Sequence, residues 1–313
     1  MHVAVLDDYA RAAERLADWS ALGADVTFHT EHIADTDALV AALAGVDVVV
    51  AMRERTSFDA DRFDRLPALK LLVTTGMANA SIDLEAARRH GVTVSGTGGP
   101  QTATSELTWA LILSLVRHVP EEDARVRAGG WQETLGTGLA GRTLGIVGLG
   151  RLGAQVAAIG RAFGMDVIAW SRNLDPRVAA DRGARAVSKQ ELFATADVVS
   201  VHYKLSPRSV GLVGRDELAR MRPTAFLVNT SRGPIVDTDA LLETLHTGRI
   251  AGAGLDVYDV EPLPAGHPLR TAPRTVLTPH LGYSTEDTYR EFYGQAVEDI
   301  VAWRRGAPVR LLT

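Results

Sequence analysis

Short runs of apolar residues recur along the chain and alternate with longer segments in which apolar residues have helical spacing. The first third of the chain carries such runs at 3–6, 46–51, 69–75 and 92–96, and a helical stretch starts at about Ala10. Strands that alternate with helices are typical of a parallel α/β sheet. The pattern therefore predicts an α/β domain at the N-terminus.

A long apolar segment, SELTWALILSLVRH at 105–118, follows and predicts a helix that ends at Pro120 and leads into a second domain. Six further strand-like runs lie between Gly141 and about Gly282, as a doubly wound sheet requires. The final segment, 284–303, has helical spacing, and we expect it to return to the first domain. The predicted fold is thus α/β, with two doubly wound parallel-sheet domains of Rossmann type and a cleft between them. The predicted domains are 1–99 plus 284–313, which is discontinuous, and 100–283.

Composition narrows the classes of function. The 313 residues, 46% of them hydrophobic, suffice for two domains of about 150 residues each. A net charge of −5 favours neither nucleic acid nor an anionic membrane as a partner. The absence of cysteine excludes disulfides, thiolate metal sites and a cysteine nucleophile. Because the start of the chain resembles no signal peptide and no apolar run approaches about 20 residues, we expect a cytoplasmic protein.

Residues 144–171 read as an apolar strand, the turn GLGRLG, a helix rich in small residues and a second apolar strand. In such a unit Gly148 makes the tight bend, Gly150 lets the backbone approach a pyrophosphate, and Gly153 lets helix and strand pack closely. The pyrophosphate meets the unpaired N–H groups at the start of the helix. The strand, turn and helix together predict a dinucleotide site.

The residues at the end of the second strand bear on the choice of cofactor. An NAD site usually places an acid there, about 20 residues after the first glycine, to bind the adenosine 2′-hydroxyl. This chain has Ser171, Arg172 and Asn173 instead. Arg172 can pair with a 2′-phosphate, so the segment favours NADP over NAD. The alternative is that Arg172 is an ordinary solvated loop cation, which leaves NAD open.

Three side chains follow strand-like runs in the second half of the chain: Arg232, Glu261 and His280. Taken one by one, each has a structural explanation as a loop residue. Together they match the needs of hydride transfer to a 2-keto acid, because an arginine grips the carboxylate and polarises the carbonyl. A carboxylate beside a histidine favours the imidazolium that protonates the new alkoxide. We therefore expect these residues to form the catalytic site.

Four motifs, GLGRLG, NTSRGPIVD, GAGLDVYDVEP and TPHLGY, occur in an order and spacing that resemble the D-isomer-specific 2-hydroxyacid dehydrogenase family, which includes glyoxylate and hydroxypyruvate reductases and phosphoglycerate dehydrogenases. The resemblance implies an enzyme that transfers hydride reversibly between NAD(P)H and a small 2-keto acid, giving a D-2-hydroxy acid. It implies Arg232 as the partner of the substrate carboxylate and carbonyl, Glu261 as the acid that orients the histidine, and His280 as the acid/base.

The resemblance also implies that the first domain is flavodoxin-like and binds the substrate. It implies a homodimer that forms through the second, nucleotide-binding domain, with the arm around 119–140 wrapping the partner. Asp256 would hold the nicotinamide carboxamide, and Thr230 and His202 would lie along the cofactor. The full set of expected cofactor contacts is Gly148, Gly150, Arg151, Leu152, Gly153, Ser171, Arg172, Asn173, His202, Thr230, Asp256 and Gly282. The expected substrate contacts are Arg53, Met77, Ala78, Arg232 and Tyr283, with backbone groups of Gly76 to Ala78 receiving the carboxylate.

Departures from the family pattern fall around the expected pocket. GMANASID replaces a loop usually written with Gly-Asp-Asn, His202-Tyr203-Lys204-Leu205-Ser206 brings a lysine near the cofactor, and Tyr283 stands where a small residue is common. Arg53 lies where related phosphoglycerate dehydrogenases place an arginine that faces substrate. A second anionic group on the substrate is therefore one hypothesis, and ordinary loop charges at Arg53 and Arg55 are the other.

Two further functions stay open at this stage. The carboxy-terminal-binding corepressors resemble the same family and act as nucleotide-sensing scaffolds, and the phosphite and formate dehydrogenases act on other small anions. No histidine pair has the spacing of a metal site such as HExxH, so we expect no metal. No GxSxG sequence supports a serine hydrolase.

Overall fold

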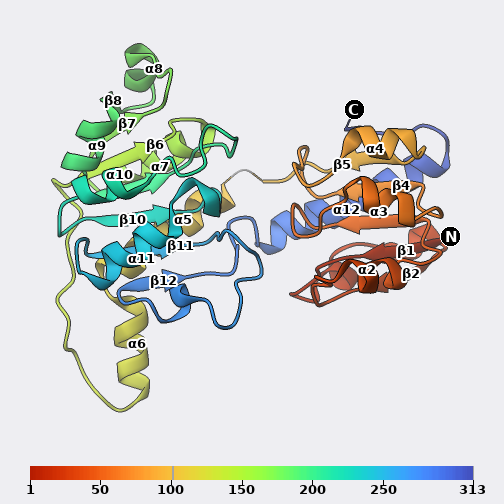
Figure 1. Cartoon of the computed structure of the whole chain (residues 1–313), viewed down its shortest axis with the longest axis horizontal. Helices are drawn as coiled ribbons and strands as arrows, with labels where there is room; N and C mark the ends of the chain where they lie inside the picture. Colours follow the sequence, from red (N-terminus) through yellow and green to blue (C-terminus); the bar gives the residue numbers. More distant parts are fainter. Residues whose placement is uncertain (101, 313) are drawn as a thin grey trace. The chain divides into compact units, whose positions relative to one another are not determined.

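The computed structural model describes residues 1–100 and 102–312 and divides into two compact units (Figure 1). Unit 1 is Met1–Pro100 with Ser284–Thr313, and unit 2 is Gln101–Tyr283. Each unit is an α/β domain built on a parallel sheet, so the predicted fold class is confirmed.

Unit 1 contains a five-stranded parallel sheet in the order β2-β1-β3-β4-β5. Its inner strands are apolar and wholly buried because helices cover both faces, as parallel sheets require. Asp35, Asp59 and Asp83 cap the helices that follow them by accepting backbone N–H bonds. The strands are β1 (His2–Val5), β2 (Asp25–Phe28), β3 (Val48–Ala51), β4 (Leu71–Thr74) and β5 (Thr93–Gly96). The helices are α1 (Ala13–Leu16), η1 (Trp19–Leu22), α2 (Thr36–Ala42), α3 (Ala60–Arg65), α4 (Leu84–Arg89) and α12 (Glu286–Arg304).

The last helix and the C-terminal tail complete unit 1. Helix α12 packs against β4 and α1. Beyond it the chain pairs with β5: Gly96 N–H donates to the Arg310 carbonyl at 2.9 Å, and Leu312 N–H donates to Val94 at 2.9 Å. Arg310 Nε also lies 2.9 Å from Oδ1 of the buried Asp299 on α12, which ties the tail to the helix.

Unit 2 contains a seven-stranded parallel sheet in the order β12-β11-β10-β9-β6-β7-β8. The strand order reverses direction between β6 and β9, which is where doubly wound sheets bind ligands. The strands are β6 (Thr143–Val147), β7 (Asp166–Trp170), β8 (Arg185–Ala186), β9 (Val198–Val201), β10 (Phe226–Asn229), β11 (Gly252–Leu255) and β12 (Thr275–Leu277). The helices are α5 (Ala103–Val116), α6 (Val119–Arg127), α7 (Arg151–Ala162), α8 (Pro176–Asp181), α9 (Lys189–Thr195), α10 (Arg215–Arg220), η2 (Gly233–Ile235), α11 (Thr238–His246) and η3 (Pro268–Thr271).

The long apolar helix differs from its prediction at its end. Helix α5 stops at Val116, and His118 takes a left-handed backbone conformation with φ of 53°. Pro120 then lies in the first turn of α6, where its missing N–H costs nothing. The proline therefore starts a second helix instead of ending the first.

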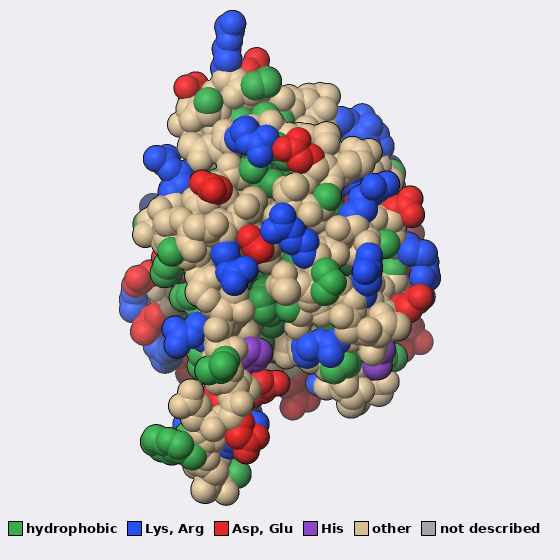
Figure 2. Space-filling model, turned by 90° about the vertical axis from the view of Figure 1, so that its left-hand side faces the viewer, with side chains coloured by type: hydrophobic (Ala, Val, Ile, Leu, Met, Phe, Trp, Pro, Cys, Tyr) green, Lys and Arg blue, Asp and Glu red, His purple; other side chains and the backbone are tan. Residues whose placement is uncertain are grey.

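Helix α6 and the segment up to about residue 140 form an arm, which Figure 1 shows projecting from unit 2. No residue of α6 is buried. Trp131 is 78% exposed and Leu135 is 86% exposed. Figure 2 shows apolar side chains at the surface of this projecting part.

Candidate active site

The glycine turn of unit 2 has the geometry that a dinucleotide needs. Gly148 has φ of +99°, and a Cβ there would lie 2.5 Å from the carbonyl oxygen of His202. At Gly153 a Cβ would lie 2.2 Å from the Gly148 carbonyl, so the first turn of α7 packs tightly on the loop. The space beside Gly150 is open. Since α7 starts at Arg151 without a side-chain cap, its N-terminus can receive a pyrophosphate.

The loop after β7 is bound to this turn. The Leu149 N–H donates to Oγ of Ser171 at 3.0 Å, and Arg182 donates to the Leu149 carbonyl. Ser171 therefore holds the glycine turn in place, while Arg172 and Asn173 beside it are exposed. Arg151 is exposed at the start of α7, and Leu152 is half-buried behind it.

A hollow of about 450 Å³ lies beside the glycine turn. Its lining includes three cationic side chains and no carboxylate. The sequence predicts Arg172 and Lys204 near the cofactor, but no sequence pattern predicts Arg208. Arg208 lies in the loop after β9, and the fold of this loop places its side chain in the lining of the hollow. The hollow is lined by Gly148, Gly150, Ser171, Arg172, Asn173, His202, Tyr203, Lys204, Ser206 and Arg208.

His202 directly follows β9 and lies beside the glycine turn. Burial lowers the pKa of its imidazole to about 4, so the ring is neutral at pH 7. Its Nε2 lies 2.8 Å from Oγ of Ser200, which fixes the ring orientation. Farther along the same sheet edge, Oγ1 of Thr230 lies 2.8 Å from Oγ1 of Thr108 on α5.

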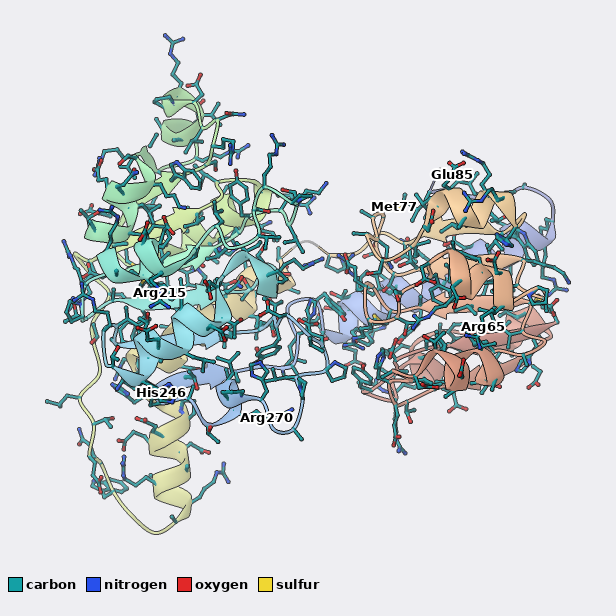
Figure 3. The ribbon with its side chains drawn as sticks, viewed as in Figure 1. Arg65, Met77, Glu85, Arg215, His246 and Arg270 are labelled. Atoms are coloured by element: carbon teal, nitrogen blue, oxygen red, sulfur yellow. The ribbon has the colours of Figure 1, made fainter. Side chains whose placement is uncertain are left out.

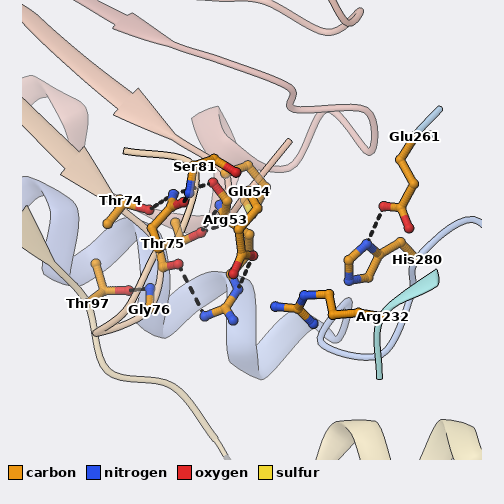
Figure 4. Close-up of polar contacts among 12 residues, drawn as sticks. Arg53, Glu54, Thr74, Thr75, Gly76, Ser81, Thr97, Arg232, Glu261 and His280 are labelled. Atoms are coloured by element: carbon orange, nitrogen blue, oxygen red, sulfur yellow. Dashed lines mark hydrogen bonds and ion pairs between the residues drawn. The ribbon is translucent and has the colours of Figure 1, made fainter. Parts of the chain in front are cut away.

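The three expected catalytic residues follow three neighbouring strands. Arg232 comes after β10, Glu261 after β11 and His280 after β12, and these strands are adjacent in the sheet. Parallel strands end at one edge, so the topology brings the three loops together. Nδ1 of His280 lies 2.5 Å from Oε2 of Glu261 (Figure 4). The other carboxylate oxygen, Oε1, accepts the N–H of Tyr258 at 2.9 Å, which fixes the acid.

This pairing decides which nitrogen of His280 is available for chemistry. Because Nδ1 faces Glu261, Nε2 is the nitrogen left for proton exchange. The side chains of His280 and Glu261 are 17% and 27% exposed, so the pair is largely withdrawn from water. Tyr283 packs edge-on against the imidazole, with 5.5 Å between the ring centres. Figure 4 shows the Arg232 side chain extending beside the His280 ring.

Asp256 lies beneath the turn that carries His280 and is fully buried. Its Oδ1 accepts from Oγ1 of Thr278 at 2.6 Å and from the Leu281 N–H at 2.7 Å. Its Oδ2 accepts the Gly282 N–H at 2.9 Å. Burial raises the pKa of this carboxyl, and its hydrogen bonds oppose the shift. Asp256 therefore fixes the turn on both sides of His280, and its expected contact with the cofactor stays a prediction.

In unit 1 the expected substrate residues gather at the carboxyl ends of β3 and β4. The Arg53 N–H donates to Oγ1 of Thr75 at 2.9 Å, and its guanidinium lies against Gly76, where a Cβ would be 1.8 Å from Nη1 (Figure 4). The Gly76 N–H is already bound to Oγ1 of Thr97 at 3.0 Å.

The N–H groups of Met77 and Ala78 have no acceptor among residues 1–100 and 102–312. Both residues are exposed, and Figure 3 labels Met77 in the loop after β4. Two open backbone donors thus follow the glycine against which Arg53 lies.

Comparisons with known proteins agree with this arrangement. A family model described as "D-isomer specific 2-hydroxyacid dehydrogenase, NAD binding domain" matches residues 109–282. The chain belongs to this family. It is 41% identical to a glyoxylate reductase of Aeropyrum pernix over 258 residues, which are 79% of this chain and 77% of the relative. It is 37% identical to a D-3-phosphoglycerate dehydrogenase of Bacillus subtilis, covering 82% of this chain and only 50% of that protein.

A solved structure extends the likeness to the whole fold. The crystal structure of a phosphoglycerate oxidoreductase from Vibrio cholerae superposes with a TM-score of 0.94 at 37% identity, covering 98% of this chain and 100% of that one. Unit 2 contains the NAD-binding domain of the family, and the chain is a dehydrogenase that uses a nicotinamide cofactor. Within the described ranges, no helix is long and apolar enough to cross a membrane.

Proposed function

We propose that this dehydrogenase reduces small 2-keto acids to D-2-hydroxy acids, with Arg232, Glu261 and His280 as its catalytic residues. The observation that carries the proposal is the 2.5 Å contact between His280 and Glu261 next to Arg232. A carboxylate, an imidazole and a guanidinium on one sheet edge supply what carbonyl reduction needs from a protein: a proton donor, an acid that orients it, and a cation for the substrate.

Each residue has a separate task. Glu261 holds Nδ1 and stabilises the imidazolium, so Nε2 of His280 carries a proton toward the substrate oxygen. Arg232 binds the carboxylate and draws electron density from the carbonyl. A nicotinamide cofactor held by unit 2 would supply the hydride for the carbonyl carbon. As the carbon–oxygen double bond becomes a single bond, the His280 proton goes to the oxygen, and the reverse transfer serves oxidation.

We propose that unit 1 binds the substrate through Arg53, Met77 and Ala78. Arg53 lies against Gly76, next to the open N–H groups of Met77 and Ala78, so one carboxylate can accept from all of these donors. We propose small 2-keto acids such as glyoxylate and hydroxypyruvate as substrates. Tyr283, which packs against His280, is proposed to limit their bulk.

We propose NADP(H) as the preferred cofactor. The hollow beside the glycine turn contains Arg172, Lys204 and Arg208 and no acid, so a 2′-phosphate meets cations where an acid would repel it. Arg172 follows the strand after the glycine turn, where the choice between the two cofactors is usually made. Lys204 and Arg208 add charge from the loop after β9.

A homodimer in the cytoplasm is the quaternary state and location we propose. Support for the dimer comes from the arm of unit 2, whose exposed Trp131 and Leu135 are unusual for a monomer surface. Family resemblance favours the same surface. The chain has no cysteine, which fits a reducing compartment.

Turnover measured at the nicotinamide absorbance band tests the function. The purified protein is given glyoxylate, hydroxypyruvate, pyruvate and a phosphorylated keto acid, each with NADPH and with NADH. We expect reduction of at least one unphosphorylated keto acid, with NADPH preferred. The variants His280→Ala and Arg232→Ala should lose most turnover and keep cofactor binding. His246→Ala is the matched control, since His246 is exposed and its Nδ1 lies 2.8 Å from the Leu242 carbonyl of its own helix, α11. Normal rates in either site variant would refute the assignment.

A further inference from the structure

The segment Met52–Thr56, which carries Arg53, is held in an uncommon conformation. Arg53 has φ of +51°, a left-handed value that few residues other than glycine adopt. Such a conformation persists only where its surroundings impose it. From the β4 side, Thr75 accepts the Arg53 N–H at 2.9 Å, and Nδ2 of Asn79 donates to the Arg53 carbonyl at 2.6 Å.

The other end of the segment is held by Asp7, two residues beyond β1. Oγ1 of Thr56 donates to Oδ2 of Asp7 at 2.6 Å. Nη1 of Arg55 donates to the Asp7 carbonyl at 2.7 Å. Because β1 and β3 are neighbours in the sheet, these bonds join the two loops that leave it side by side.

Asp7 has a buried side chain with hydrogen-bond partners on both carboxyl oxygens. It is 1% exposed, and Nδ1 of His32 lies 2.9 Å from its Oδ1. The Tyr9 hydroxyl donates to the same oxygen at 3.3 Å. Both carboxylate oxygens therefore accept hydrogen bonds from different loops. An amide in its place keeps only one acceptor oxygen, so the hydrogen bonds that converge on the two carboxylate oxygens must rearrange and weaken.

We propose that Asp7, acting through Thr56, is a positioning residue for the substrate site, because it fixes the segment that presents Arg53 beside Gly76. The inference rests on the proposed function, since it assumes that Arg53 binds the substrate carboxylate. Asp7 does not itself contact substrate in this scheme. It determines the affinity for the keto acid and leaves hydride transfer and cofactor binding alone.

The chain offers a matched control in the next residue. Asp8 is also a carboxylate with 1% exposure, but its oxygens accept the N–H groups of Ala12 and Ala13 at 2.9 Å and cap α1. Within the described ranges its side chain bonds to α1 and to the Tyr293 hydroxyl of α12, and not to the Met52–Thr56 segment. Asp8→Asn therefore makes the same substitution in the same loop without loosening Arg53.

Steady-state kinetics separate the two aspartates. In Asp7→Asn the KM for the keto acid should rise about tenfold, the effect of weakening the hydrogen bonds that converge on this carboxyl group, while kcat changes less than about twofold. Asp8→Asn should leave that KM unchanged. Thr56→Val, which keeps the shape and removes only the hydroxyl, should raise KM as Asp7→Asn does, and Thr56→Ser should restore it. Equal KM values in Asp7→Asn and Asp8→Asn would overturn the proposal.

A second readout does not depend on turnover. Hydrogen exchange of the peptide that contains 52–58 should quicken in Asp7→Asn and Thr56→Val, and stay slow in Asp8→Asn. Unchanged exchange in both of the first two variants would also overturn the proposal. The hydrogen-exchange measurement needs no substrate turnover. Failure of the proposed function and failure of the positioning role can therefore be told apart.

The double variant Asp7→Asn/Arg53→Ala tests whether Asp7 affects substrate affinity through Arg53. If Asp7 acts through Arg53, the KM of the double variant should match that of Arg53→Ala alone. If the fold-increases in KM of the two single variants multiply in the double variant, Asp7 acts on KM by a route that does not include Arg53. If Arg53→Ala leaves KM unchanged, the assumed role of Arg53 falls, and the positioning role falls with it.

Discussion

Nδ1 of His280 lies 2.5 Å from Oε2 of Glu261, although the two residues follow different strands. The histidine itself has a left-handed backbone, with φ of 55°, held by the bonds from its turn to Asp256. One nitrogen is thus committed to the acid before any substrate arrives, and the other is the only ring nitrogen placed to exchange a proton. Such preorganisation means that no energy is spent on orienting the base during reaction.

We predict that Glu261→Gln lowers kcat about 100-fold and leaves the Kd for NADPH unchanged. The amide keeps the size of the side chain but supplies no charge to stabilise an imidazolium. Stopped-flow measurement of NADPH oxidation and fluorescence titration of NADPH check the two quantities. Glu243→Gln is the control, because Glu243 is an exposed acid of the same unit paired with Arg215. A normal kcat in Glu261→Gln would mean that the pair is structural only.

We predict that Arg208→Ala weakens binding of NADPH about tenfold and leaves binding of NADH unchanged. The arginine lines the hollow in which a 2′-phosphate is proposed to lie, and NADH has no such group. Titration with 2′,5′-ADP and with 5′-ADP, which lack the nicotinamide, isolates this contact from catalysis. Arg220→Ala, in α10 outside the hollow, is the control. Equal losses for both nucleotides would place Arg208 on the pyrophosphate or the adenine instead.

The fold and the family were predictable because their signals are local. Buried parallel strands such as β3 and β4 read as continuous apolar runs, and the glycine turn lies between two of them. Two strands were missed: β2 lies at a sheet edge and is partly exposed, and β8 has only two residues. The expected stop at Pro120 was wrong because proline fits the first turn of a helix as well as the residue after one.

The site was only partly readable from sequence. Arg232, Glu261 and His280 lie in motifs that follow strands, so their common edge could be predicted from topology. Arg208 lies in a loop without a motif, and only the folded loop brings it to the same hollow as Arg172. The hydrogen bonds of Asp7 link residues 49 positions apart, and no periodicity reports such a contact.

We predict that Asp299 makes the protein less stable as pH rises from about 4 to about 7. Burial raises the pKa of this carboxyl to about 7, and Arg310 opposes the shift without cancelling it. The folded state therefore keeps a proton that the unfolded chain releases near pH 4, so this stabilisation is complete below pH 4 and lost as pH passes 7. The full effect is at most about 4 kcal/mol.

Urea unfolding at pH 5 and pH 8 checks this dependence. The free energy of unfolding of the wild type should fall more between the two pH values than that of Asp299→Asn, which has no proton to lose. Glu298→Gln is the control, since Glu298 pairs with the same arginine but is exposed. An identical pH dependence in wild type and Asp299→Asn would contradict the raised pKa.

We predict that Trp131→Glu converts a dimer into a monomer. The arm leaves Trp131 and Leu135 almost fully exposed, and charge at the centre of an apolar contact opposes association. Sedimentation velocity over a range of protein concentrations measures the change. Val210→Glu is the matched control, because Val210 is an apolar residue of the same unit, 61% exposed and outside the arm. If both variants sediment like the wild type, the arm is not the subunit interface. A monomeric wild type would contradict the proposed dimer.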